Sequence, residues 1–92
     1  MIFDLLRDLE LIMSDIVFSG INNIDYTTIE KIEVLSNKFK KISMDNLKEL
    51  LDDFVLSIKK YKTDNNKKEN IKEVSDYICK IEFYIKNALS SE

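Results

Sequence analysis

Apolar residues recur along this chain at intervals of three and four positions, which is the spacing of amphipathic helices. The first apolar stripe consists of Ile2, Leu5, Leu6, Leu9, Ile12, Met13 and Ile16. Three further stripes follow, and short polar segments separate them. The pattern therefore predicts four helices, at about residues 2–19, 27–42, 44–62 and 67–89.

Residues that favour helix ends lie between the stripes. We expect Gly20 to end the first helix, because glycine adopts the left-handed conformation of a C′ residue without a Cβ penalty. Thr27 and Glu30 have the spacing of a capping box for the second helix, and Asp25 is the alternative N-cap. The caps expected for the third and fourth helices are Ser43 and the pair Asn66 and Glu69.

The scarcity of turn residues bears on the fold class. The 92 residues contain one Gly and no Pro, whereas all-β folds need turn residues at regular intervals. This length leaves room for a single domain, residues 1–92. Short connections favour antiparallel neighbours. We therefore predict an all-α fold, namely a four-helix bundle of up-down antiparallel topology, with two stacked helical hairpins as the alternative.

Residue types for catalysis and cofactor binding are few. The chain has no His, so the commonest general base and metal ligand is missing, and one Gly cannot form a phosphate-binding loop. Asp52 and Asp53 point about 100° apart on a helix, and we expect both to be solvated. Cys79 lies off the apolar stripe, with Lys80 on another face. We expect no enzymatic activity, no cofactor and no metal.

Charge is unevenly distributed, although the net charge is only −3. Residues 1–25 contain five acids and one base. A candidate basic patch spans the end of the third helix and the start of the fourth, formed by Lys59, Lys60, Lys62, Lys67, Lys68 and Lys72. Nucleic acid would bind there, but Arg7 is the only arginine, and arginine leads base recognition. We therefore rank nucleic acid below a protein partner.

Targeting signals are not evident in the sequence. Asp4, Asp8 and Glu10 stand where a secretory signal would carry basic residues, and no run of about 18 apolar residues predicts a membrane span. A single Cys fits a reducing compartment, and abundant Ile, Lys and Asn are typical of A/T-rich bacterial or phage genomes. We expect a cytoplasmic protein of bacterial or phage origin that does not enter a membrane.

A few apolar residues fall outside the stripes when each helix is projected at about 100° per residue. Leu11 and Phe18 lie seven positions apart on the polar side of the first helix. Cys79 and Phe83 lie four apart on the polar side of the fourth. Clustered exposed apolar side chains indicate an interaction site. These four residues form the predicted interaction surface, and bent helices or a fold that buries both faces are the alternative explanations.

A pattern of three parts covers about the first 60 residues. A first helix ends in Gly20 and Ile21. An aliphatic helix with Ile29, Ile32 and Leu35 follows. A third helix begins after a very short turn and contains Met44, Leu47, Leu50 and Leu51. In this pattern the chain resembles the helical regions that accompany bacterial SWIM zinc-finger proteins. Those fingers hold zinc with three Cys and one His, which this chain lacks. The resemblance implies only a helical accessory or interaction module.

Two functional hypotheses compete. The first is a non-catalytic helical protein–protein interaction module of unknown partner, with a homodimer through the first and fourth helices as one form of it. The alternative is a small bacterial or phage inhibitor or immunity protein that docks on a toxin or enzyme. Its contact with a basic target would be the acidic first helix, through Asp4, Asp8, Glu10 and Asp15.

Overall fold

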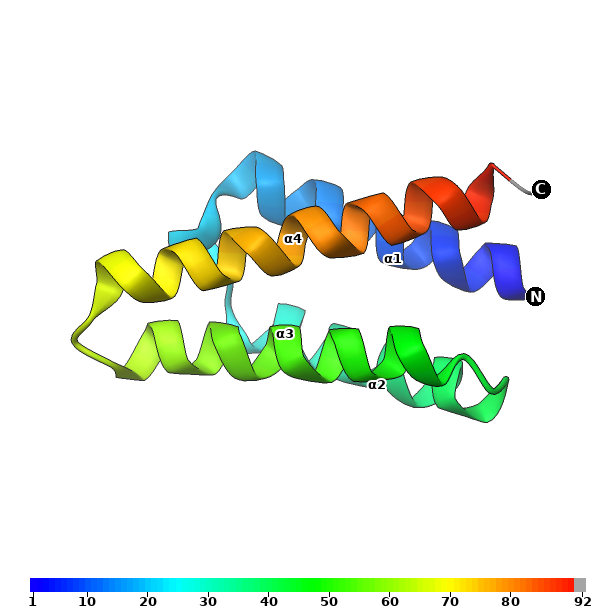
Figure 1. The fold of residues 1–92 in the computed structure, drawn as a ribbon, viewed down its shortest axis with the longest axis horizontal. Helices are drawn as coiled ribbons and strands as arrows, with labels where there is room; N and C mark the ends of the chain where they lie inside the picture. Colours follow the sequence, from blue (N-terminus) through cyan, green and yellow to red (C-terminus); the bar gives the residue numbers. More distant parts are fainter. Residues whose placement is uncertain (91–92) are drawn as a thin grey trace.

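The structure is a computed structural model, and it describes residues 1–90. This part of the chain forms four helices and one short 3₁₀ turn. The helices are α1 (Ile2–Ser19), α2 (Tyr26–Lys41), α3 (Asp45–Thr63) and α4 (Lys67–Leu89). The turn η1, Ile21–Asn23, follows α1. Successive helices run in opposite directions along one long axis, which confirms the predicted all-α, up-down four-helix bundle (Figure 1).

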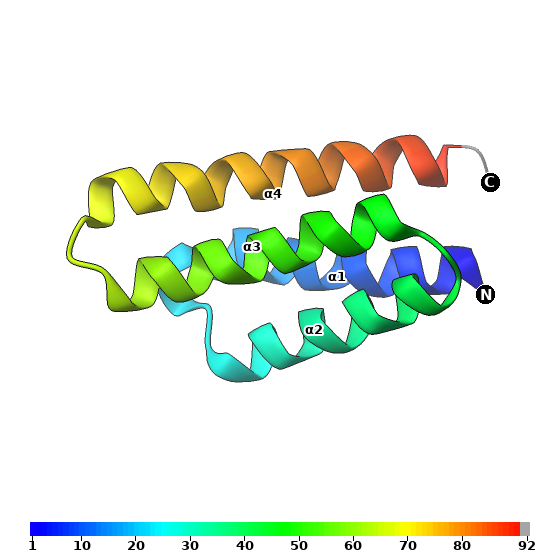
Figure 2. The ribbon, with the colours of Figure 1, turned by 60° about the horizontal axis from the view of Figure 1, so that its bottom comes forward.

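Each helix packs against the two helices beside it. α3 packs closely on both α2 and α4, and α1 closes the bundle against α2 and α4. The N-terminus, the end of α4 and the α2–α3 turn lie at one end of the bundle, whereas η1 and the α3–α4 loop lie at the other (Figure 2). α1 and α4 are thus antiparallel neighbours, and we call the outer surface along the line of contact between them the α1–α4 seam.

The predicted stripes supply one continuous core. The largest fully buried side chains come from all four helices and include Leu6, Leu9, Ile32, Phe39, Phe54 and Ile81. Two stripe positions differ from the prediction: Ile2 of the first stripe and Ile71 of the fourth lie near the N-terminal ends of their helices and are 40% and 36% exposed. Ile24, which the pattern left in a loop, is 3% exposed and packs into the core.

The start of α2 is fixed by Asp25. Its carboxylate oxygen Oδ1 accepts a hydrogen bond of 2.8 Å from the Thr28 backbone N–H and one of 3.0 Å from the Thr28 hydroxyl. Such a side chain satisfies one of the orphan donors in the first helical turn. The predicted capping box of Thr27 and Glu30 is therefore wrong, and the alternative N-cap is the one the chain uses.

The turn between α2 and α3 has the hydrogen bonds of a Schellman motif. The Met44 N–H donates to the Phe39 carbonyl at 2.9 Å, and the Ser43 N–H donates to the Lys40 carbonyl at 3.0 Å. Ser43 has a φ of 65°, the conformation for which glycine is preferred. Ser43 therefore ends α2 and does not cap α3, whose N-cap is Met44 without a side-chain hydrogen bond. The predicted Ser43 cap is wrong.

The two remaining helix ends follow the prediction in part. Gly20 ends α1 with the expected positive φ of 93°, but its ψ of 151° turns the chain directly into η1. Asn66 is the N-cap residue of α4, yet its side chain accepts no hydrogen bond from the helix. Its Nδ2 donates instead to Glu69 Oε2 at 2.7 Å.

Candidate functional site

The predicted interaction residues lie on the surface. Phe18 is 93% exposed, Phe83 72% and Leu11 64%, and Cys79 is an exposed free thiol. A phenylalanine that is this exposed lacks the stabilisation that burial of its ring would provide, which is about 1.5–3 kcal/mol. Because the stripes already fill the core without these residues, a second buried layer within the bundle does not account for them.

An open groove of about 880 Å³ lies between α1 and α4. Its apolar lining consists of Met13, Val17, Phe18, Phe83, Ile85 and Leu89. Phe18 and Phe83 therefore border the same groove, although they come from opposite ends of the sequence. Leu11 and Cys79 lie outside this lining. Val17, which is 58% exposed, belongs to the site but was missed because the apolar stripe runs beside it at Ile16.

Two lysines of the predicted basic patch pair with acids on neighbouring helices. Lys59 Nζ lies 3.8 Å from Glu33 Oε2 of α2, and Lys60 Nζ lies 4.0 Å from Glu73 Oε2 of α4. Both pairs are exposed, so they contribute little to stability. They do lower the positive potential that a phosphate backbone would meet.

Two more lysines of the patch lie over tyrosine rings. Lys62 Nζ is 5.3 Å from the centre of the Tyr26 ring, and Lys67 Nζ is 4.8 Å from that of Tyr61. Lys67 also donates a hydrogen bond to the Tyr61 carbonyl. The patch thus consists largely of lysines that tie α2, α3 and α4 together at one end. This arrangement disfavours a nucleic-acid interface.

A polar network joins α2 to α3 around Asp52. Ser36 Oγ donates to Asp52 Oδ1 at 2.6 Å, and Lys48 Nζ donates to Asp52 Oδ2. Ser36 is buried, whereas the Asp52 side chain is 39% exposed. The prediction of two solvated acids therefore holds for Asp53 and holds only in part for Asp52, which is also hydrogen-bonded to two neighbours. The spacing of Lys48 and Asp52, four apart, could have indicated their pair. Nothing in the sequence indicates the bond from Ser36.

The electrostatics of this network oppose a catalytic role. Partial burial raises the pKa of Asp52, but the hydrogen bonds from Lys48 and Ser36 outweigh that effect and hold the pKa below its usual value. The same hydrogen bond raises the pKa of Lys48. A carboxylate of lowered pKa is a poor general base, and Ser36 as a residue is only 2% exposed, so its hydroxyl is out of reach of a substrate.

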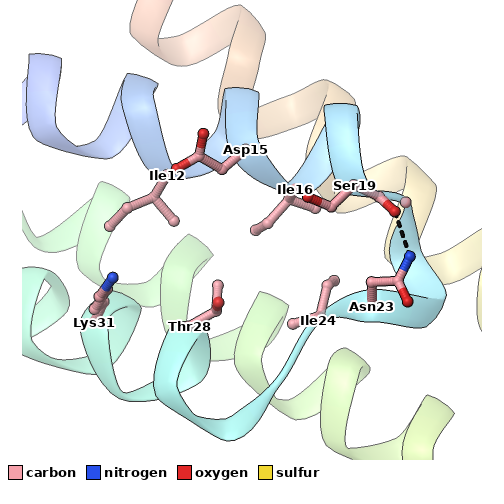
Figure 3. A pocket seen from close by; sticks show the side chains of 9 residues that line it. Ile12, Asp15, Ile16, Ser19, Asn23, Ile24, Thr28 and Lys31 are labelled. Carbon is pink, nitrogen blue, oxygen red and sulfur yellow. Dashed lines mark hydrogen bonds between the residues drawn. The ribbon is translucent and has the colours of Figure 1, made fainter.

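A smaller pocket of about 70 Å³ lies where α1 meets η1 and the start of α2 (Figure 3). Its apolar wall is formed by Ile12, Ile16 and Ile24. Asp15 and Lys31 bring one charge of each sign to the lining, and Asn23 Nδ2 donates to the Ser19 carbonyl at 2.5 Å. The volume suits a few water molecules, since ligand pockets typically measure about 300–1,000 Å³.

Within residues 1–90, no three His, Cys, Asp or Glu side chains come together as a metal site would require. None of the helices in this range combines the length and the apolar character of a membrane span.

Comparisons with family models, with curated proteins and with solved structures found no significant match to this chain. The resemblance to helical regions of SWIM zinc-finger proteins therefore stays a prediction. The site with the clearest physical character in the described residues is the apolar groove between α1 and α4.

Proposed function

We propose that this protein is a non-catalytic helical interaction module that docks another protein chain along the seam of α1 and α4. The observation that carries the proposal is the placement of two exposed phenylalanines, Phe18 and Phe83, on one groove. Aromatic anchors around a pocket are typical of the residues that dominate binding energy at protein interfaces.

The groove supports helix docking by its shape and composition. Two adjacent antiparallel helices present a channel whose apolar floor, Met13 and Ile85, is continuous with the core. Glu10, Glu82 and Lys86 lie along its sides and supply a polar rim. A helix that lays an apolar face into this channel would extend the packing already present between the four helices.

Photo-crosslinking in cells tests the proposal. A photoreactive phenylalanine analogue replaces Phe18 or Phe83 in the full chain, and Leu56 of α3, which is 64% exposed, serves as the matched control site. We expect an adduct of one defined mass from positions 18 and 83, identified by mass spectrometry, and none from position 56. Equal adducts at all three positions, or none at all, would overturn the proposal.

A second candidate function is an inhibitor or immunity protein that docks on a basic target. Its support is the acidic character of α1, where Asp4, Asp8, Glu10 and Asp15 are all exposed. The crosslinking experiment separates the two outcomes, because an adduct with a toxin or enzyme favours this candidate. Adducts would then form from photoreactive groups placed at Asp8 as readily as from position 83.

A further inference from the structure

We propose that the α1–α4 groove takes an amphipathic helix of a different protein, with a lysine or arginine on each side of its apolar face. This inference rests on the proposed interaction function and names the chemistry of the partner. Three observations carry it: the length of the groove, the charges that border it, and the lack of a matching helix face on this chain's own α2 and α3.

The groove has the form of a channel along two helices. Residues 10–18 of α1 and residues 82–90 of α4 line it, which is roughly two and a half turns of each helix. Its floor is buried and apolar, whereas Phe18 and Phe83 at its borders are largely exposed. A helix laid along the channel would bring apolar side chains to the floor at successive turns and cover both rings.

Two carboxylates border the groove, one on each helix. Glu10 lies on the α1 side and Glu82 on the α4 side, and both are exposed. Neither forms an ion pair with another residue in the range 1–90. Lys86 is the one base that the described residues bring to the groove, and it lies in the last turn of α4, where a cation complements the helix dipole. A docked helix would therefore meet an unpaired acid on each of its two sides.

These two acids make the groove selective for positive charge on the docked helix. Exposed charges beside an apolar helix seam contribute modestly to affinity, but they decide which partner is accepted. A helix with bases on both sides is attracted by Glu10 and Glu82 together, whereas a helix with acids there is repelled by both. The excess of acids in the whole chain, 17 against 14 bases, acts in the same direction at longer range.

The outward faces of α2 and α3 do not offer such a helix. On α2 the exposed large apolar side chains are Tyr26 and Val34, eight positions apart, and on α3 Leu56 stands alone. A stripe that fills a groove needs an apolar residue every three or four positions. α1 and α4 themselves carry two acids beside their apolar residues, whereas the groove favours bases there. We therefore assign the docked helix to a different protein.

Binding of two synthetic peptides to the full chain tests the inference. Both peptides are amphipathic helices of about 20 residues with leucine at alternating intervals of three and four. They differ only at the positions beside the leucines, which are lysine in one peptide and glutamate in the other. Fluorescence anisotropy at low salt gives the dissociation constants. We expect the lysine peptide to bind roughly tenfold more tightly, and the preference to shrink as salt screens these charges.

Charge reversal at the groove should invert this preference. The variant carrying Glu10→Lys and Glu82→Lys should bind the glutamate peptide more tightly, because the same two positions then repel lysine. The control variant carries Glu30→Lys and Asp53→Lys, which change the net charge equally at exposed positions of α2 and α3, and it should still prefer the lysine peptide. Phe83→Ala should weaken the binding of both peptides, since both lie against this ring.

Four results would contradict the inference. A preference for the lysine peptide that survives the reversal at Glu10 and Glu82 would mean that these acids do not select the partner. Equal binding of both peptides, weakened by Phe83→Ala, would overturn the basic partner and leave the groove as a docking site. The same holds if neither peptide binds while position 83 crosslinks to a protein. A position-83 adduct of twice the mass of one chain would identify a second copy as the occupant. Absence of both peptide binding and adducts would overturn the interaction function as well.

Discussion

A single residue with positive φ shapes each of two short turns, the one between α1 and η1 and the one between α2 and α3. Gly20 has a φ of 93°, where a side chain would be strained although the nearest atom to an added Cβ is 3.8 Å away. Ser43 adopts a φ of 65° and bears the strain that a glycine there would avoid. The first position was foreseeable because Gly20 is the only glycine, whereas nothing about Ser43 marks it in the sequence.

Replacement of Ser43 by glycine should therefore stabilise the protein. The Schellman hydrogen bonds remain, and relief of backbone strain exceeds the extra freedom of glycine in the unfolded chain, for a net gain of about 0.5–1 kcal/mol. Urea unfolding measures this change. The matched control is Ser14→Gly, at an exposed position within α1, which should be destabilising. A loss of stability in both variants would contradict the account of the turn.

At the scale of helices, features that depend on a single segment could be predicted from the sequence, whereas contacts between two segments could not. The apolar period located all four helices because each must bury one face in the core. The start of α2 was ambiguous, since both Asp25 and Thr27 can cap a helix and only the position of the Thr28 N–H decides between them. The bond from Ser36 to Asp52 joins residues 16 apart on two helices, so it depends on helix packing.

The Asp52 network gives the bundle a defined pH dependence. Because the folded state lowers the pKa of Asp52, its contribution to stability is present above the unfolded pKa of this acid. That contribution is lost as the pH falls through the folded pKa, that is, below about 4. We expect Asp52→Asn to lower the free energy of unfolding at pH 7 and to differ less from the unmodified chain as the pH approaches 2.

Asp53→Asn is the control, since Asp53 is the exposed neighbour in the same helix. Chemical unfolding at several pH values measures the difference for both variants. A constant difference between Asp52→Asn and the unmodified chain across this range would contradict the role assigned to the ionised carboxylate. An equal effect of Asp53→Asn would do so as well.

At the scale of the whole molecule, polar and apolar features are divided between two regions. One end joins α2, α3 and α4 through lysines that pair with acids or lie over tyrosines, so its charge serves the fold. The α1–α4 seam instead exposes aromatic side chains that the fold does not use. The sequence identified Phe18 and Phe83 as outward-facing, but their position on one groove follows only from the antiparallel packing of α1 and α4.

Crosslinking from residue 83 tests this account most directly. A photoreactive group at position 83 of the full chain should form an adduct of one defined mass with the docked protein chain. The Phe83→Asp variant should keep the helical content and thermal unfolding of the unmodified chain, because residue 83 is 72% exposed and lies outside the core, and it should lose the adduct formed from position 18. An unchanged adduct from position 18 in this variant, or no adduct from position 83, would contradict docking on the groove.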